Sequence, residues 1–270
     1  ISVHFRSEQV FTFLRNLHER LDGAMRDAGT FGCVGWSDMV DARFGGNAFA
    51  AAKGVERLQC QGLVEVIEAR GPKGGAFKVL GLTGKGVERL GRGPGGQRYW
   101  TSSKPRQAAH DAAVYRAAKA ATQDIRKRGG EVGRVVIDTE FRSKVARRVE
   151  RARAKAGEAA ARAAAKAIAD ELHLPCKDGK VSYPDARIEY TDSRGDAGRV
   201  DIEVATGHYR RGTVAGKSAA GFTVYTTSSL AAAARAARGL GGGGAGGSGG
   251  GDDGGGGGGH PDDDRGLISL

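Results

Sequence analysis

The stretch YPDARIEYTDSRGDAGRVDIEVA, residues 183–205, carries the pattern that decides the fold. Apolar and polar side chains alternate in 184–190 and again in 199–205, and a polar segment separates the two runs. Alternation with a period of two is typical of β-strands, and polar residues between such runs favour a turn. We therefore expect two adjacent strands, which bring Asp185 and Glu203 together.

Two neighbouring carboxylates predict a site for a divalent cation. Mg²⁺ and Mn²⁺ prefer oxygen ligands, so Asp185 and Glu203 are the expected metal ligands. Such a cation polarises a phosphodiester and lowers the pKa of an attacking water. Lys217 is the expected third catalytic residue beside these two acids, because its charge would stabilise a phosphorane. The alternative is structural: Asp185 caps a strand and Glu203 pairs with an arginine.

The neighbouring segments predict a mixed-sheet α/β unit over residues 108–238. Further helices are expected at 110–128, 140–172, 212–220 and 229–238, and further strands at 133–138 and 222–226. This order resembles the core of the PD-(D/E)XK nucleases, with one long helix inserted after the first strand. That superfamily usually has a lysine where this chain has Ala205, so the resemblance implies that Lys217 replaces it. The superfamily also includes inactive members.

The first 92 residues predict a winged helix-turn-helix, so the expected fold class is α+β. Helices at 8–28, 36–40, 48–61 and 83–90 and a hairpin around 70–75 follow from the hydrophobic periods. Asn47 is the expected N-cap of the third helix, whose core side would carry Phe49, Ala52, Val55 and Leu58, with Ala51 as a further candidate. The expected DNA contacts are Arg43, Asn47, Lys53 and Arg57 at this helix and Arg70, Lys73 and Lys78 in the wing. The alternative to DNA contact is that the winged helix mediates dimerisation, so the sequence also allows a homodimer.

A basic segment at 141–155 contains seven Lys or Arg and one acid, Glu150. On a helix, Arg147, Arg151 and Lys155 are spaced four residues apart and form one stripe that could follow a phosphate backbone. A solvated helix face is the alternative reading of the same charges.

The overall charge favours an anionic partner, double-stranded DNA above all. The formal net charge is +11, and because residues 239–270 contain five Asp and one Arg, residues 1–238 carry +15.

Other features of the sequence bear on location and domain boundaries. The sequence contains no stretch of about 18 apolar residues, so it predicts no membrane span. Three widely spaced cysteines favour a reducing, cytoplasmic location. Residues 93–107 are typical of a linker, and 239–270 of a disordered Gly-rich tail, since 241–259 contains 15 glycines.

Four motifs together resemble the plasmid replication-relaxation family of bacterial mobile elements. They are HDAAVYRA (110–117), RVVIDTEFR (134–142), PDARIEY (184–190) and DIEVATGHYRRGTVAGKSAAGFTVY (201–225). The resemblance implies a role in replication or transfer of a plasmid, phage or integrative element, together with replication or conjugation machinery. His110, Asp111, His208 and Tyr209 match family positions, and the last two could orient a phosphate.

Two functions remain open from the sequence. The first is a metal-dependent DNA nuclease or nickase that uses Mg²⁺ or Mn²⁺. The second is a non-catalytic DNA-binding protein, either a replication accessory protein or a repressor. Convergence of Asp185, Glu203 and Lys217 would favour the enzyme, whereas acids that pair with Arg187 or Arg199 would favour the binding protein.

Overall fold

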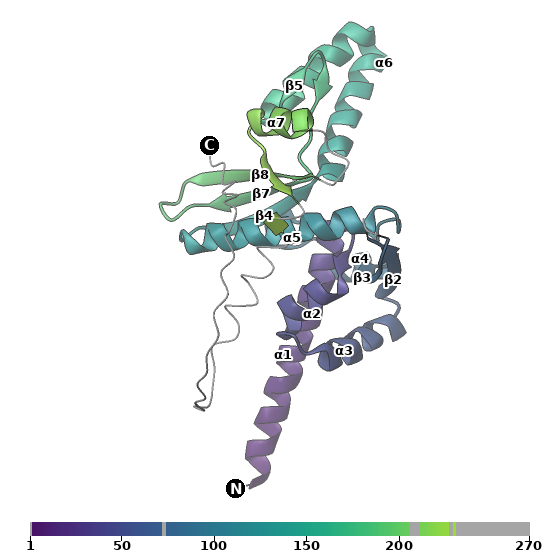
Figure 1. The fold of residues 1–270 in the computed structure, drawn as a ribbon, viewed down its shortest axis with the longest axis vertical. Helices are drawn as coiled ribbons and strands as arrows, with labels where there is room; N and C mark the ends of the chain where they lie inside the picture. The colour runs from purple at the N-terminus through teal and green to yellow at the C-terminus, as the bar shows by residue number, and fades with distance from the viewer. Residues whose placement is uncertain (1, 72–73, 206–210, 227–228, 231–270) are drawn as a thin grey trace, which may run out of the picture.

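The computed structural model describes residues 2–71, 74–205, 211–226 and 229–230 of a mixed α/β protein (Figure 1). Lys73, His208, Tyr209 and the glycine-rich tail lie outside the described residues, as does nearly all of the helix expected at 229–238. None of the described helices combines the length and the apolar character that a membrane span requires.

The N-terminal half has the expected order of helices, hairpin and helix. Its elements are α1 (Ser2–Phe31), β1 (Val34–Gly35), α2 (Trp36–Phe44), α3 (Ala48–Cys60), β2 (Val64–Arg70), β3 (Ala76–Leu82) and α4 (Gly84–Leu90). The strands form one antiparallel sheet in the order β1-β3-β2. The two-residue strand β1 was not predicted, because it is too short to show a hydrophobic period.

Helix α3 begins as predicted, but one of its faces was assigned wrongly. The Asn47 side chain accepts a hydrogen bond of 2.9 Å from the backbone N of Ala50 and so caps the helix. Val55 and Leu58 are buried as expected, whereas Phe49 is 76% exposed and Ala52 is also exposed. The buried stripe of α3 consists of Ala51, Gly54, Val55 and Leu58. Position 49 lies away from that stripe at helical spacing, so its aromatic ring faces outward.

The C-terminal half is built around a four-stranded mixed sheet. Its elements are the 3-10 turn η1 (Pro94–Gly96), α5 (Ala108–Lys127), β4 (Glu131–Ile137), α6 (Asp138–Glu171), β5 (Cys176–Lys177), β6 (Lys180–Val181), β7 (Ala186–Thr191), β8 (Ala197–Ala205), α7 (Arg211–Ala219) and β9 (Thr223–Thr226). The strand order is β4-β7-β8-β9; β7 is antiparallel to both β4 and β8, and β9 is parallel to β8. The small β5–β6 hairpin was not predicted.

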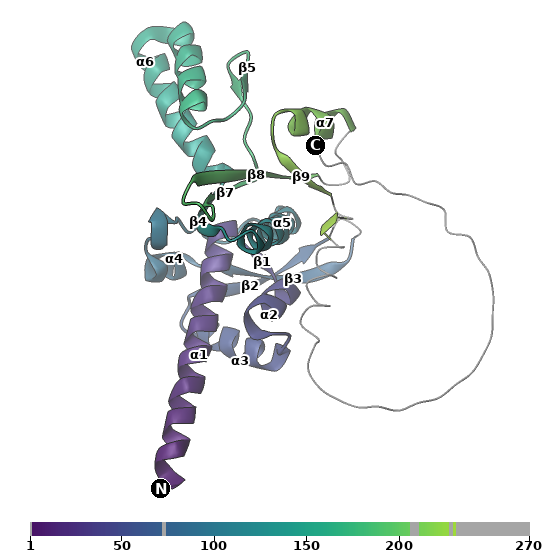
Figure 2. The same cartoon turned by 90° about the vertical axis from the view of Figure 1, so that its left-hand side faces the viewer.

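Helix α5 lies between the two sheets and joins them into one core (Figure 2). Leu80 of the N-terminal hairpin, Tyr115 of α5, and Ile188 and Ile202 of the four-stranded sheet belong to a single buried apolar cluster. Each of these four side chains is at most 2% exposed. The two halves therefore share their hydrophobic interior rather than folding around separate ones.

The segment expected to be a linker is packed between the halves. The backbone N of Trp100 donates to Gly29 O at 2.7 Å, and that of Ser102 donates to Leu82 O at 2.9 Å. Gln97 Oε1 accepts from the backbone N of Val135 at 2.9 Å, and Tyr99 is buried. These contacts attach the segment to α1, β3 and β4.

The opposite face of the four-stranded sheet carries a projecting lobe, residues 138–183, which rises above the sheet in Figure 1. Helix α6 is broken at Ala156 and Gly157, and its second part turns back alongside the first, where Arg148 pairs with Glu171. A separate small core holds the base of the lobe and includes Val136, Phe141, Ala169 and Leu174.

Candidate active site

Asp185 stands immediately before β7 and is fixed by its backbone. Its N donates to Ile202 O at 2.9 Å, and its O accepts from Asp138 N at 3.2 Å. The antiparallel register pairs Ala186 with Ile202, so position 185 lies beside position 203 on the next strand. The predicted pairing of the two strands is confirmed.

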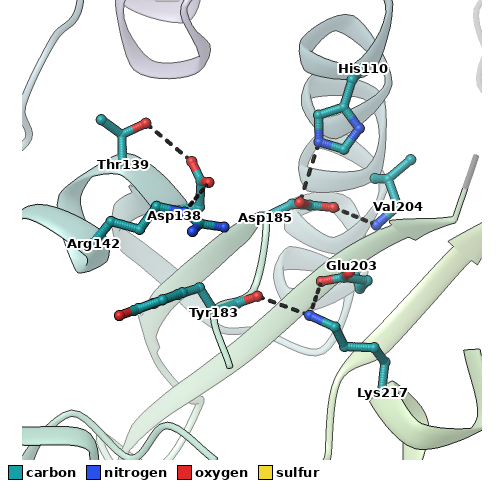
Figure 3. A network of polar contacts seen from close by, with 9 residues as sticks. All are labelled: His110, Asp138, Thr139, Arg142, Tyr183, Asp185, Glu203, Val204 and Lys217. Carbon is teal, nitrogen blue, oxygen red and sulfur yellow. Dashed lines mark hydrogen bonds and ion pairs between the residues drawn. The ribbon is translucent and has the colours of Figure 1, made fainter. Parts of the chain in front are cut away.

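The Asp185 carboxylate is oriented by two hydrogen-bond donors (Figure 3). Oδ2 accepts from the backbone N of Val204 at 2.8 Å, and Oδ1 lies 3.3 Å from His110 Nε2. The bond to Asp185 raises the pKa of His110 above its usual 6.5; the carboxylates of Asp111 and Asp138 act in the same direction, and burial opposes them. The protonated imidazole is therefore favoured here.

Glu203 is almost completely buried, and Lys217 is its cationic partner. Its side chain is 2% exposed, and Oε2 lies 3.1 Å from Lys217 Nζ. The same ammonium donates to Tyr183 O at 3.1 Å and lies 4.8 Å from the centre of the Phe222 ring. Glu203 thus pairs with Lys217, whereas the structural alternative expected an arginine as its partner. The structure brings Asp185, Glu203 and Lys217 together from three different segments, as Figure 3 shows.

Three neighbours of the site were not predicted: Asp138, Arg142 and Tyr183. Arg142 Nε donates to Asp138 Oδ2 at 2.9 Å, and the guanidinium lies 4.8 Å from the centre of the Tyr183 ring. An acid that directly follows a strand was the one available signal, since Asp138 begins α6 where β4 ends.

A second acid beside His110 is held in a less polar setting. Burial raises the pKa of Asp111, a side-chain hydrogen bond to Ser103 and the charge of His110 oppose that rise, and the carboxylates of Asp138 and Asp185 add to it. Several carboxylates thus lie close enough to influence one another, which is the electrostatic setting that a cation would relieve.

The donor chemistry of the site suits Mg²⁺ or Mn²⁺. Asp185 and Glu203 offer carboxylate oxygens, and a carboxylate oxygen carries two lone pairs, so it can accept a hydrogen bond and bind a cation at the same time. Mg²⁺ in proteins often takes one or two carboxylates and completes its shell with waters and substrate phosphates. Within the described ranges, no group of three or more His, Cys, Asp or Glu side chains is arranged to hold a metal ion.

Several side chains of the N-terminal half that were predicted to contact DNA interact with other groups of the protein. Arg43 donates from Nε to Asp27 Oδ2 at 2.7 Å and from an Nη to Asp27 Oδ1 at 2.5 Å, a bidentate pair that speaks against a DNA contact. Asn47 uses its side-chain oxygen as the helix cap. Lys53 is exposed and pairs with Glu56 at 3.1 Å.

The remaining predicted contacts are accessible to a ligand. Arg57 of α3, Arg70 of β2 and Lys78 of β3 are exposed. Arg147, Arg151 and Lys155 of α6 are exposed as well. These six side chains are compatible with the role expected of them.

Comparison with protein-family models, with curated proteins and with solved structures finds no match to this chain.

Proposed function

We propose that this chain is a DNA-binding protein of a plasmid, phage or integrative element that cleaves or nicks DNA with Mg²⁺ or Mn²⁺. The main support is that Lys217 Nζ of α7 lies 3.1 Å from Glu203 Oε2, and that Glu203 lies beside Asp185, which directly precedes the neighbouring strand β7. Two acids and a lysine that converge from distant segments can hold a cation and stabilise the charge that develops in metal-assisted phosphodiester cleavage.

The order of elements supports this proposal. α5, β4, β7, β8, α7 and β9 follow the helix, three strands, helix and strand of the PD-(D/E)XK core, with the lobe 138–183 inserted after the first strand. The acids precede or occupy the second and third strands, where the resemblance requires them. Membership of the replication-relaxation family and the mobile-element context are part of the same proposal.

The N-terminal half would supply DNA binding as a winged helix-turn-helix. α3 would be the recognition helix, because Lys53 and Arg57 are exposed four residues apart. The β2–β3 hairpin would be the wing, with Arg70 and Lys78 near flanking phosphates.

Each residue of the site has a defined task in this proposal. Asp185 and Glu203 would hold the cation, which supplies charge neutralisation and a more acidic bound water. Lys217 would keep a positive charge beside the scissile phosphate. His110 would orient the Asp185 carboxylate through the contact at 3.3 Å.

A non-catalytic DNA-binding protein, either a replication accessory protein or a repressor, is the second candidate. One observation favours it: Glu203 is 2% exposed and already balanced by Lys217. A buried acid with a fixed cationic partner is also the arrangement of a purely structural ion pair.

Cleavage of supercoiled plasmid in Mg²⁺ or Mn²⁺ separates the two candidates. The enzyme predicts metal-dependent nicking that Asp185→Asn and Glu203→Gln abolish, and that Lys217→Met slows by about 10²–10³-fold, the usual cost of a lost charge-stabilising donor. Glu189→Gln, on an exposed acid of β7, is the matched control and should cleave normally. Duplex binding without any metal-dependent cleavage would establish the second candidate instead.

A further inference from the structure

The projecting lobe carries a surplus of cations that its acids do not balance. Arg153 pairs with two acids, Glu150 and Glu158, and Arg148 pairs with Glu171. The lobe cations that form no salt bridge with any carboxylate in the described part of the chain are Arg147, Arg151, Lys155, Arg162, Lys166, Lys177 and Lys180. All seven are exposed.

The β5–β6 hairpin concentrates this charge at one place. Lys177 and Lys180 are directly paired across the two strands, an arrangement that repulsion between like charges destabilises. The turn between them, Asp178 and Gly179, has φ values of 51° and 73°, which fix a tight connection. The stem of the Arg162 side chain lies against Gly179, so a third cation adjoins the pair.

The hairpin is attached firmly to the candidate active site. Val181 and Tyr183 pack against the small core that contains Phe141, and Tyr183 O accepts the hydrogen bond of Lys217 at 3.1 Å. Both views place β5 on the same side of the four-stranded sheet as α6 and α7 (Figures 1 and 2). An anion bound at the hairpin would therefore be held in a fixed relation to the two acids.

We propose that Arg162, Lys177 and Lys180 form a second phosphate-binding surface, which holds the backbone of duplex DNA beside Asp185 and Glu203. A phosphodiester would relieve the repulsion between the paired lysines, and three cations at one site could contact consecutive phosphates. The inference rests on the proposed function, because it takes DNA as the partner.

The chemistry of the lobe favours nucleic acid over a membrane surface. A helix that lies on a bilayer needs an apolar face beside its charges. Among the described residues the exposed large apolar side chain is Phe49 of α3, which is far from the lobe in the sequence. The lobe therefore offers charge without an apolar anchor.

The test is the salt dependence of duplex binding by the full chain, in a Glu203→Gln background that prevents cleavage. Arg162→Gln with Lys177→Gln and Lys180→Gln should lower the slope of log K against log salt by about 0.9 for each lost contact, about 2.7 in all. Arg126→Gln with Lys127→Gln and Arg128→Gln removes the same charge at the C-terminal end of α5, outside the lobe, and is the control. Circular dichroism of each variant verifies that the exposed substitutions leave the fold intact.

Equal slopes for the two triple variants would overturn the proposal while leaving DNA binding and cleavage standing. A parent chain that binds no duplex would overturn this inference and the proposed function together. Phosphatidylserine vesicles are the second ligand: if the hairpin variant loses vesicle binding but keeps the duplex slope of the parent chain, the surface is a membrane contact and the proposal fails.

Discussion

At the scale of single residues, the His110–Asp185 contact links the helix shared by both halves to the candidate active site. Nε2 and Oδ1 are 3.3 Å apart, and this contact is the largest cause of the raised pKa of His110. A histidine that is more basic in the folded than in the unfolded chain stabilises the fold only while it is protonated.

We predict that the stabilisation contributed by His110 depends on pH. It should be complete below about pH 6.5, the value of an unperturbed histidine, and should disappear as pH rises through the higher pKa of the folded protein. Urea unfolding of the parent chain and of His110→Asn across this range measures the difference in free energy. A difference that grows with rising pH would contradict the assigned contact.

Strand β8 carries two acids on the same face, and only the structure distinguishes their tasks. Asp201 pairs with Arg187 at 2.6 Å, and the two side chains are 10% and 5% exposed. Arg187 also donates to Leu172 O and His173 O, so this pair fastens the end of α6 to the sheet. Glu203, two residues later, pairs with the lysine of α7 instead.

Asp201→Asn should destabilise the fold by about 3–5 kcal/mol, because it leaves the buried Arg187 charge without its partner. Arg194→Gln is the comparison, since the Arg194 side chain is 81% exposed beside Asp192. Its cost should stay below about 1 kcal/mol, as for other surface pairs. Similar losses in the two variants, measured by chemical denaturation, would show that the buried pair is not specially costly to break.

At the scale of helices and strands, the sequence predicted the elements whose hydrophobic pattern is long enough to repeat. β7, β8 and α3 were anticipated, whereas the two-residue strands β1, β5 and β6 were not. The contacts of side chains whose partners are distant in the sequence could not be predicted either. Asp27 on α1 engages the Arg43 side chain, which was predicted to contact DNA, and no local pattern reveals that pairing.

The candidate site was predictable to the extent that strand register fixes it. Alternation places Asp185 and Glu203 side by side once their strands pair. Lys217 was identified through its charge and through a resemblance, since the period of α7 does not indicate which strand residue the Lys217 side chain contacts. His110 as the partner of Asp185 depends on how α5 crosses the sheet, which a sequence pattern does not encode.

The break in α6 gives a prediction at the same scale. Gly157 has φ 75° and ψ −167°, a conformation that is essentially restricted to glycine. Gly157→Ala should cost about 1–3 kcal/mol of stability. Gly216→Ala in the middle of α7 is the control and should stabilise its helix by up to about 1 kcal/mol, since nothing blocks a side chain there. Helix content and chemical denaturation check both signs.

At the scale of the whole molecule, α5 makes the two halves interdependent. Tyr115 packs edge-on against Phe31 with ring centres 5.3 Å apart, and its hydroxyl donates to Asp27 at 3.1 Å. Arg116 pairs with Asp38 of α2 at 3.0 Å. Removing either half would expose apolar surface that the other half covers.

We therefore predict one cooperative unfolding transition for the full chain. Calorimetry should give equal calorimetric and van't Hoff enthalpies, and fluorescence and far-ultraviolet dichroism should report the same midpoint. Tyr115→Ala should lower that midpoint without splitting the transition, because both halves lose the same contact. Two separated transitions in the parent chain would show that the shared core does not couple the halves.

The insertion of the lobe between β4 and β7 also sets the order in which the sheet can assemble. β4 pairs with β7 across the whole of residues 138–185, whereas β7 and β8 are joined by a short turn. Pulse-labelled hydrogen exchange during refolding should therefore protect β7 and β8 before β4, because closing the longer loop costs more entropy. Simultaneous protection of the three strands would contradict this order.

The same insertion separates β4 from β7 in time during synthesis. On a ribosome that adds about 5–20 residues per second, β4 emerges roughly 2–10 s before β7 has been synthesised. During that interval α5 is already synthesised and can cover the apolar face of β4.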